Sequence, residues 1–362
     1  MKNFKKYFKN KKIIITGHTG FKGSWLSLWL KMCGAKIIGA SKGIPSKPSH
    51  FKVLKLNKKI SDKRIDISNL KVLKKLFIKT KPDFVFHFAA QALVKNSYLD
   101  PIDTFETNTI GTLNVLESLR SLRKKCTAIL ITSDKSYRNM ALKRGYREDD
   151  ILGGDDPYSS SKASAELVIQ SYLKSYFSSR NNKILIGVAR AGNVIGGGDW
   201  SKDRLIPDCI RSWSNKKIVK IRNPKSTRPW QHVLEALNGY LTLAIKLKNN
   251  SNFHGEVFNF GPNKYYDLSV ISVMKLIKKN WKDAKWKIIK NKNNYFYESK
   301  LLKINSSKAK KYLKWRCVLS FNETIDMISY WYKNFYKNKK VDKKFTFKQI
   351  KDFENILKIR NR

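Results

Sequence analysis

Short apolar runs alternate with helix-length amphipathic segments through the first half of this 362-residue chain. The apolar runs lie at 12–16, 36–40, 83–88, 127–132 and 184–190. Strand–helix alternation of this kind predicts a parallel sheet with helices on both faces, the doubly wound α/β class. In such sheets ligands bind at the carboxyl ends of the strands. We therefore predict a Rossmann-type fold with functional residues directly after its strands.

Four segments carry apolar residues at helical spacing. One helix is predicted to begin near Gly23, and a second to follow Ser68, which is a candidate N-cap. Two longer helices are predicted over about 102–122 and 159–177.

The regular alternation ends near residue 192, where the loop GNVIGGGDW begins. We divide the chain into a dinucleotide-binding domain over 1–190, to which some later segments return, a smaller C-terminal substrate-binding lobe over 191–337, and a basic tail over 338–362. The weak amphipathic pattern of the tail fits either a surface helix or a partly disordered segment.

The formal net charge of +48 raises the alternative of a protein that binds nucleic acid or a membrane surface. However, the basic residues are spread along the whole chain together with many Asn, Ile, Phe and Tyr residues, as expected from a general drift in composition. A localised basic patch is not evident. We therefore predict that neither nucleic acid nor membrane is a partner.

Other sequence features also favour a cytoplasmic protein. No apolar stretch approaches the roughly 20 residues of a membrane span, and the basic N-terminus has no signal-peptide core. The four cysteines are widely scattered with no C-x-x-C pair, which predicts reduced thiols and gives no support for a metal site.

The turn TGHTGFKG, residues 16–23, spaces its glycines as G-x-x-G-x-x-G between the first predicted strand and helix. Glycine permits a tight turn, and a helix N-terminus offers N–H groups and a positive dipole to a pyrophosphate. Lys22 can add a mobile charge beside the cofactor pyrophosphate or a substrate diphosphate, and His18 can donate at the same rim. The cofactor-binding residues predicted in this turn are Gly17, Thr19, Gly20, Phe21, Lys22 and Gly23.

The second predicted strand ends at Ala40, Ser41 and Lys42, without the acidic residue that holds an adenosine ribose. By that test NADP fits as well as NAD. Asp66, in RIDISN, follows a short possible strand. It is either a turn acid before the next helix or a contact to the adenine ring.

Tyr158 and Lys162, in YSSSK, lie four residues apart on one helix face. A nearby ammonium lowers the pKa of a tyrosine, which makes the pair suited to moving a hydroxyl proton while hydride leaves the same carbon. The segment TSDKSY follows the fourth predicted strand, so Ser133 can share that proton.

Together these motifs resemble the extended short-chain dehydrogenase/reductase family that acts on sugar nucleotides. HFAAQ at 87–91 and the helix TNTIGTLNVLE at 107–117 add to the resemblance. Asp134 and Lys135 stand where 4,6-dehydratases have an additional acid–base pair, which epimerases and simple reductases generally lack. Longer segments such as GHTGFKGSWLSLWL and RAGNVIGGGDW look like the dehydratases of this family that act on CDP-glucose, and the similarity covers roughly residues 8–335.

The resemblance implies a reaction without net redox change, used in deoxysugar and O-antigen lipopolysaccharide synthesis. Tyr158, aided by Ser133 and Lys162, takes the proton of the sugar C4 hydroxyl while hydride leaves C4. Asp134 is the acid for the departing C6 hydroxyl. Lys135 is either a neutral base at C5 or a charged group that stabilises the enolate.

The resemblance also favours NAD over NADP, tightly bound because it is regenerated in each turnover. It implies further cofactor contacts at Asp66, Ile67, Ala89, Ala90, Asn108, Tyr158 and Lys162. For the substrate, CDP-glucose, it implies contacts at Ser97, Asn193, Arg204, Leu205 and Arg228, where the guanidinium forks of the two arginines suit a diphosphate. Family members usually pair through the two long helices, so we expect a homodimer or homotetramer. Another sugar-nucleotide dehydratase or a 4-epimerase is the remaining alternative.

Overall fold

The computed structural model describes residues 4–179, 182–262, 267–289, 303–337 and 344–360. Its centre is a seven-stranded sheet in the order β11-β6-β5-β4-β1-β2-β3, and every neighbouring pair is parallel. The strands are β1 (Lys12–Thr16), β2 (Lys36–Ser41), β3 (Ser61–Arg64), β4 (Phe84–His87), β5 (Cys126–Ile131), β6 (Ile184–Ala191) and β11 (Val257–Phe260). The predicted Rossmann-type fold is confirmed.

Helices cover both faces of the sheet because alternate strand residues point to opposite sides. Ile13 and Ile15 of β1 belong to a core with α2 and α10, whereas Ile14 packs in a second core with α4, α7 and α8. The helices of the sheet region are α1 (Phe4–Phe8), α2 (Phe21–Met32), α3 (His50–Val53), α4 (Leu70–Thr80), α5 (Val94–Leu99), α6 (Pro101–Phe105), α7 (Gly111–Arg120), α8 (Pro157–Ser175) and α10 (Val233–Asn249).

One helix prediction needs correction and another needs refinement. Helix α4 is capped by Asn69 and not by Ser68, because the Asn69 side chain accepts the Val72 amide at 3.1 Å. The long helix expected over 102–122 is present, since α6, a π-helical turn at Glu106–Ile110 and α7 follow one another without a break. Such turns frequently occur at functional sites.

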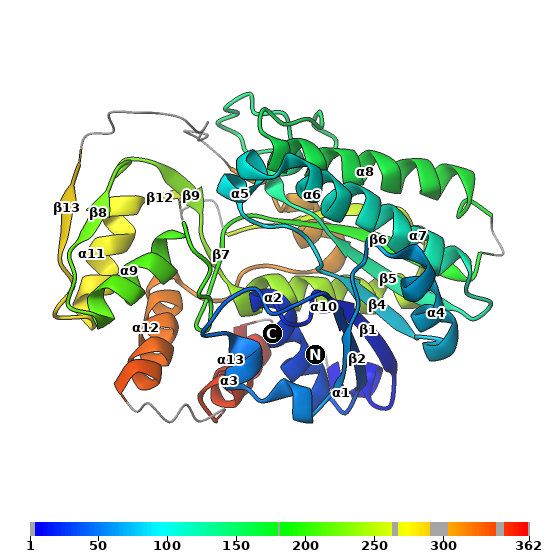
Figure 1. Cartoon of the computed structure of the whole chain (residues 1–362), viewed down its shortest axis with the longest axis horizontal. Helices are drawn as coiled ribbons and strands as arrows, with labels where there is room; N and C mark the ends of the chain where they lie inside the picture. The colour runs from blue at the N-terminus through cyan, green and yellow to red at the C-terminus, as the bar shows by residue number, and fades with distance from the viewer. Residues whose placement is uncertain (1–3, 180–181, 263–266, 290–302, 338–343, 361–362) are drawn as a thin grey trace.

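A smaller lobe follows β6, and most of its elements lie at the left of Figure 1. It is built on three two-stranded sheets, β10-β7, β12-β9 and β13-β8. Its strands are β7 (Val194–Ile195), β8 (Val219–Ile221), β9 (Thr227–Pro229), β10 (Gln231–His232), β12 (Asp267–Ser269) and β13 (Trp286–Ile288), and its helices are α9 (Leu205–Ser214), α11 (Val270–Asn280) and α12 (Phe321–Lys337).

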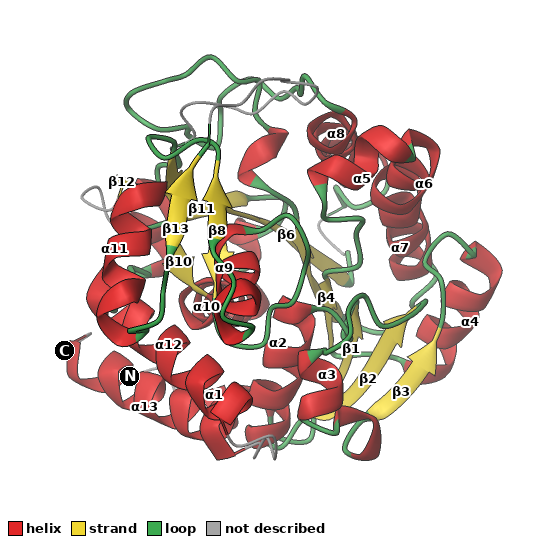
Figure 2. Cartoon of the chain, turned by 60° about the vertical axis from the view of Figure 1, so that its left-hand side comes forward, coloured by secondary structure: helices red, strands yellow, loops and turns green. Residues whose placement is uncertain are grey.

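The basic C-terminal segment forms helix α13 (Lys344–Arg360), which packs against α2 and α12 (Figure 2). Ile350 and Phe353 are buried, and Glu354 accepts a hydrogen bond from the Trp29 indole at 2.8 Å. Of the two alternatives for this tail, a helix is the one found; residues 338–343 and 361–362 lie outside the described part. Within the described residues, no helix is both long enough and apolar enough to span a bilayer.

Candidate active site

The glycine-rich turn between β1 and α2 is closely packed against the loop that follows β4. Gly17 has φ +73°, and a Cβ at this position would lie 2.7 Å from the Ala89 nitrogen. A Cβ on Gly23 would lie 2.2 Å from the Gly17 carbonyl oxygen. Only glycine fits these positions.

Helix α2 begins at Phe21, and its N-cap, Gly20, supplies no side chain to the first amides. The first N–H groups of a helix have no partner within the helix, so they can bind an anion. This cradle suits the pyrophosphate of a dinucleotide, and the residues present therefore fit NAD.

The expectation that His18 donates a hydrogen bond at the rim of this cradle is not met. Its side chain is fully buried, with Nδ1 at 2.9 Å from the Ser41 hydroxyl and Nε2 at 2.9 Å from Asp62. Burial lowers the pKa of His18, against the opposing effect of Asp62. Because both ring nitrogens are bonded inside the protein, the interpretation of His18 as a phosphate donor is wrong. It joins the turn to β2 and β3.

Charged side chains at the rim of β2 and β3 are paired with one another. The Lys42 ammonium lies 2.9 Å from Asp103 and 3.8 Å from Asp66. Asp66 also accepts the Ser68 amide at 3.0 Å, which is the turn role considered for it. The neighbouring Ile67 carbonyl accepts from Asn114 at 2.9 Å. The adenine contact of Asp66 and Ile67 stays a prediction.

Asn108, in the π-helical turn, connects the loop after β4 to α8. Its Oδ1 accepts the Gln91 amide at 2.9 Å, and its Nδ2 donates to the Ser161 hydroxyl at 2.9 Å. Ala89, in the same loop as Ala90, bonds through its amide to the Thr16 hydroxyl at 3.3 Å. These bonds hold the loop beside the glycine turn.

Ser133 and Tyr158 come together as predicted from their motifs. Ser133 follows β5 by two residues, Tyr158 is the second residue of α8, and the Ser133 hydroxyl is close enough to act on the pKa of Tyr158. Burial raises the pKa of Tyr158, and the nearby Ser133 hydroxyl opposes this effect. Ser97 accepts the Tyr158 amide at 3.1 Å and donates to the Val94 carbonyl at 2.7 Å, so its hydroxyl supports the start of α8.

Lys162 lies one helical turn beyond Tyr158 and is buried. Burial lowers the pKa of Lys162 to about 8, and Glu166 acts in the opposite direction. The positive charge of Lys162 lowers the pKa of His87 on β4 and of Lys22 on α2. This lysine therefore lies at the base of the site, between the cofactor turn and the tyrosine.

Asp134 has one bonded and one open carboxyl oxygen. Oδ1 accepts from the Ser133 hydroxyl at 3.1 Å, whereas buried Oδ2 has no hydrogen-bond partner among the described residues. Burial raises the pKa of Asp134 to about 6, although Lys135, Arg228 and Lys22 oppose the shift. A carboxyl group with this pKa can hold a proton close to neutral pH. Half-buried Lys135 is the first of these cations.

A cluster of cations surrounds Asp134. Burial lowers the pKa of Lys22 to about 8, and the charges next in effect are Arg204 and Lys162. Lys22 is therefore near the charges of Arg204 and Lys162, while its contact with the cofactor pyrophosphate or the substrate diphosphate stays a prediction. Arg204 caps α9 immediately before Leu205, and its guanidinium lies 3.0 Å from Asp199.

The remaining substrate candidates lie on the lobe side of the cluster. Arg228 belongs to β9, and its charge acts on Asp134. Asn193 stands between β6 and β7, where its carbonyl accepts the Gln231 amide at 3.0 Å. Their contacts with substrate stay predictions.

Two buried carboxylates in this region were missed from the sequence. Glu166 follows Lys162 by four residues, so helical spacing was an available signal. Asp199 follows a run of three glycines and gave no signal, because only the folded chain brings it to Arg204.

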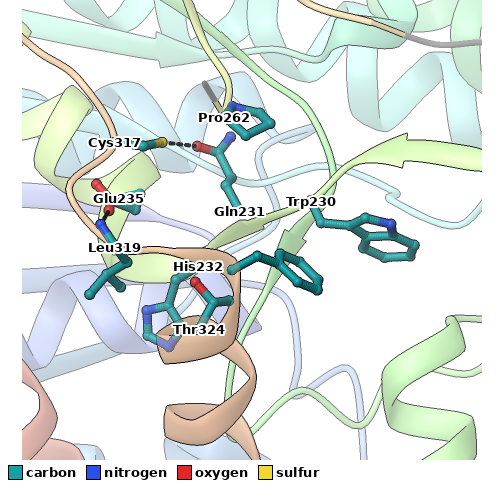
Figure 3. A pocket seen from close by; sticks show the side chains of 9 residues that line it. Trp230, Gln231, His232, Glu235, Pro262, Cys317, Leu319 and Thr324 are labelled. Carbon is teal, nitrogen blue, oxygen red and sulfur yellow. Dashed lines mark hydrogen bonds between the residues drawn. The ribbon is translucent and has the colours of Figure 1, made fainter. Parts of the chain in front are cut away.

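A second group of buried polar side chains lines a cavity of about 10 Å³ between β10, α10 and the segment before α12 (Figure 3). Glu235 accepts the Val318 and Leu319 amides at 2.8 and 2.7 Å, and its Oε2 has no partner among the described residues. Burial raises the pKa of Glu235 to about 8 and lowers that of His232 to about 3. The cavity has room for about one water molecule.

The sheet order, the glycine turn and the polar groups at the strand ends define a Rossmann-type protein suited to hold a dinucleotide. The sequence pattern of the GDP-mannose 4,6 dehydratase family matches residues 14–328. The chain is 42% identical over 333 residues to CDP-glucose 4,6-dehydratase of Salmonella typhimurium (strain LT2), covering 91% of this chain and 92% of that protein. The chain belongs to the GDP-mannose 4,6 dehydratase family, and the resemblance drawn from the motifs is confirmed.

More distant proteins share the fold. dTDP-D-glucose 4,6-dehydratase of Dictyostelium discoideum is 30% identical over 74% of this chain and 61% of its own. The crystal structure of dTDP-glucose 4,6-dehydratase from Bacillus anthracis in complex with NAD superposes with a TM-score of 0.74 at 21% identity, covering 90% of this chain and 97% of that one. UDP-glucose 4-epimerase from Thermotoga maritima reaches a TM-score of 0.78 at 22% identity, over 90% and 100%.

Proposed function

We propose that this protein is an NAD-dependent hydro-lyase that converts CDP-glucose to CDP-4-dehydro-6-deoxyglucose and water. The observation that carries the proposal is the buried Asp134 carboxyl, with an open oxygen, which accepts a hydrogen bond from Ser133 near Tyr158. An enzyme that only moves hydride at C4 has no need of this additional acid. The identity of 42% to CDP-glucose 4,6-dehydratase supports the choice of nucleotide sugar.

The residues that would hold NAD come from the turn between β1 and α2, the loop after β3, and helix α8. The Gly17–Gly23 turn would receive the pyrophosphate, Asp66 and Ile67 would face the adenine, and Lys162 would donate to ribose hydroxyls. When bound, NAD supplies a hydride acceptor for sugar C4 and a hydride donor for C6. Because nothing is consumed, we expect the cofactor to stay tightly bound between turnovers.

Tyr158 would accept the proton of the sugar C4 hydroxyl. Its hydroxyl lies near Ser133, so the two residues could pass on the C4 hydroxyl proton while the sugar is oxidised. Lys162 and Arg204 add positive charge that favours the phenolate form during this step. The ketone formed at C4 makes the C5 proton acidic.

Asp134 acts at C6. Its pKa, raised to about 6 by burial, allows the carboxyl to carry the proton that the departing C6 hydroxyl needs. Lys135 removes the C5 proton or stabilises the enolate by its charge. If Lys135→Glu retains substantial activity while Lys135→Met abolishes it, the obligatory cationic role is excluded.

The cationic groups at the lobe side would bind the CDP moiety. Arg204 and Arg228 are placed on separate elements, α9 and β9, so two guanidinium forks can hold one diphosphate. Leu205, Asn193 and Ser97 are the other proposed substrate residues. Ser97 would act through the position of Tyr158, whose amide it binds.

A homodimer or homotetramer is also proposed. Leu99, Ile102 and Leu167 are 72%, 78% and 56% exposed, and they lie on α5, α6 and α8. Apolar side chains at these helices would be covered in a symmetric pair. Size-exclusion chromatography with light scattering tests this, and a monomer at micromolar concentration contradicts it.

The activity is tested by incubating the full chain with CDP-, dTDP-, GDP- and UDP-glucose and measuring the base-induced absorbance of a 4-keto-6-deoxy product. We expect product from CDP-glucose. Product from another nucleotide sugar alone would contradict the choice of substrate, and a 4-epimer as the only product would favour the epimerase alternative.

A further inference from the structure

A buried ion pair lies next to the catalytic lysine. Glu166 is on α8, one helical turn beyond Lys162, and Arg190 is on β6. Both side chains are 1% exposed. Arg190 Nε donates to Glu166 Oε1 at 2.8 Å and to Oε2 at 3.0 Å, so the carboxylate is held in one orientation.

Glu166 also binds the segment after β5 that carries the catalytic serine. The Thr132 hydroxyl donates to Glu166 Oε1 at 2.7 Å, and Thr132 directly precedes Ser133. One carboxylate therefore connects the end of β5 to the helix turn that carries Lys162. This connection sets the spacing between the serine and the lysine.

The position of Arg190 is itself fixed from two further sides. Its guanidinium lies 4.5 Å from the centre of the Tyr137 ring and donates to the Glu148 carbonyl at 3.1 Å. Tyr137 in turn donates to Asn259 of β11 at 2.8 Å. The carboxylate thus belongs to a rigid buried network that spans β5, β6, β11 and α8.

Arg190 pairs with Glu166 directly, and the other ionisable groups around Lys162 supply no negative charge. Lys22 on α2 is a like charge, Tyr158 on α8 is a phenol, and His87 on β4 is kept neutral by burial. Glu166 is the carboxylate that raises the pKa of Lys162. A buried ammonium without such a carboxylate loses its proton at a lower pH.

We propose that Glu166 is a positioning residue, which keeps the Lys162 ammonium charged and holds Lys162 and Ser133 at a fixed spacing. This inference rests on the proposed function, since it assumes that Lys162 serves the cofactor and the tyrosine. The role differs from a purely structural one because it depends on the negative charge of the carboxylate.

The test is Glu166→Gln, which keeps the shape and an oxygen acceptor but removes the charge. The affinity for NAD is measured by calorimetry from pH 6.5 to 9.5, and turnover of CDP-glucose over the same range. Lys162 is charged below its pKa, so a lower pKa moves the alkaline loss of affinity and turnover to lower pH. We expect a displacement of about one pH unit.

The matched control is Glu117→Gln. Glu117 also pairs with an arginine, Arg120, and also bonds to α8, through the Tyr172 hydroxyl at 2.9 Å, but it contacts none of the catalytic residues. Its alkaline limb is expected to coincide with that of the parent. Glu166→Asp retains the charge, and its limb should likewise stay in place even if turnover falls.

Removal of one partner of a buried ion pair can prevent folding. Glu166→Gln/Arg190→Gln removes both charges, and we expect a smaller displacement in the same direction. A folded Glu166→Gln or double variant with the parental pH profiles overturns the proposal, as does an equal displacement in Glu117→Gln. The NAD measurement needs no sugar substrate, so failure to turn over CDP-glucose would contradict the proposed function without deciding this inference.

Discussion

The buried carboxyl groups of Asp134 and Glu235 are similar in their hydrogen bonding but differ in the residues that surround them. Asp134 and Glu235 each have one oxygen without a hydrogen-bond partner among the described residues. Burial raises the pKa of both, to about 6 and about 8. Yet Asp134 lies among Lys135, Arg228 and Lys22, whereas Glu235 is held by two backbone amides beside a cavity that fits about one water molecule.

The difference shows that burial and a raised pKa do not by themselves identify a catalytic acid. Asp134 is distinguished by its neighbours, which are a serine that donates to it, a nearby tyrosine, several cations, and a glycine turn that suits a cofactor. Glu235 connects α10 to the segment before α12. We therefore expect changes near Asp134 to affect turnover and changes at Glu235 to affect stability.

The largest effect is expected for Tyr158→Phe, which removes the hydroxyl that moves the C4 proton. We predict a loss of about 10³-fold in kcat, within the range of general acid–base catalysis. Tyr172→Phe is the control on the same helix, because its hydroxyl donates to Glu117 at 2.9 Å and bonds to no catalytic residue among those that the structure describes. Steady-state kinetics with CDP-glucose decide the comparison, and similar losses in both variants would contradict it.

Asp134→Asn should remove the acid for the C6 hydroxyl and lower kcat by about 10²-fold. Oxidation at C4 should continue, so reduced nicotinamide should accumulate in a single turnover followed by absorbance. In the parent, elimination needs the protonated carboxyl, so its rate should fall as pH rises through the pKa near 6, which substrate binding can raise further. A variant that keeps the parental elimination rate would show that another group is the acid.

Glu235→Gln should leave kcat within about twofold and instead change the pH dependence of stability. The folded protein holds this proton up to about pH 8, whereas the unfolded chain releases it near 4.5. The folded state therefore binds more protons, and the parent loses stability as pH rises between these values. Thermal unfolding from pH 5 to 9 should show this loss, by a few degrees, in the parent and not in the variant; equal slopes would contradict it.

The smallest effect is expected at the exposed rim. Lys42 is 56% exposed, and its pairs with Asp103 and Asp66 are surface ion pairs, which contribute about 0–1 kcal/mol. Lys42→Ala should change NAD affinity by less than about threefold and leave kcat unaltered. A tenfold loss of NAD affinity, measured by calorimetry, would contradict this prediction, because it would show that Lys42 contributes substantially to cofactor binding.

The sheet could be predicted where its strands are continuous apolar runs. Strands β1, β2, β4, β5 and β6 are buried on both faces, so their composition is unambiguous. β11 was missed because it returns to the sheet after the smaller lobe and α10, far along the chain from the regular strand–helix alternation. β3, with the sequence SDKR, is a polar edge strand, and so it was recognised only as a short possible strand.

The candidate site was likewise predictable from the sequence only in part. Motif spacing was sufficient to bring Ser133 and Tyr158 together, because both follow directly from strand and helix positions. It could not show that His18 turns inward to Ser41 and Asp62, or that Lys22 approaches Arg204. Those directions depend on how separate elements pack, and the Glu166–Arg190 pair depends on the same tertiary contact between α8 and β6.

The central claim is that hydride leaves C4 and returns to C6 within one active site. It is tested most directly with CDP-glucose carrying deuterium at C4, followed by NMR and mass spectrometry of the product. The account predicts CDP-4-dehydro-6-deoxyglucose with the deuterium at C6 of the same molecule. Deuterium retained at C4, or a product from which the label has been lost to solvent, would contradict it.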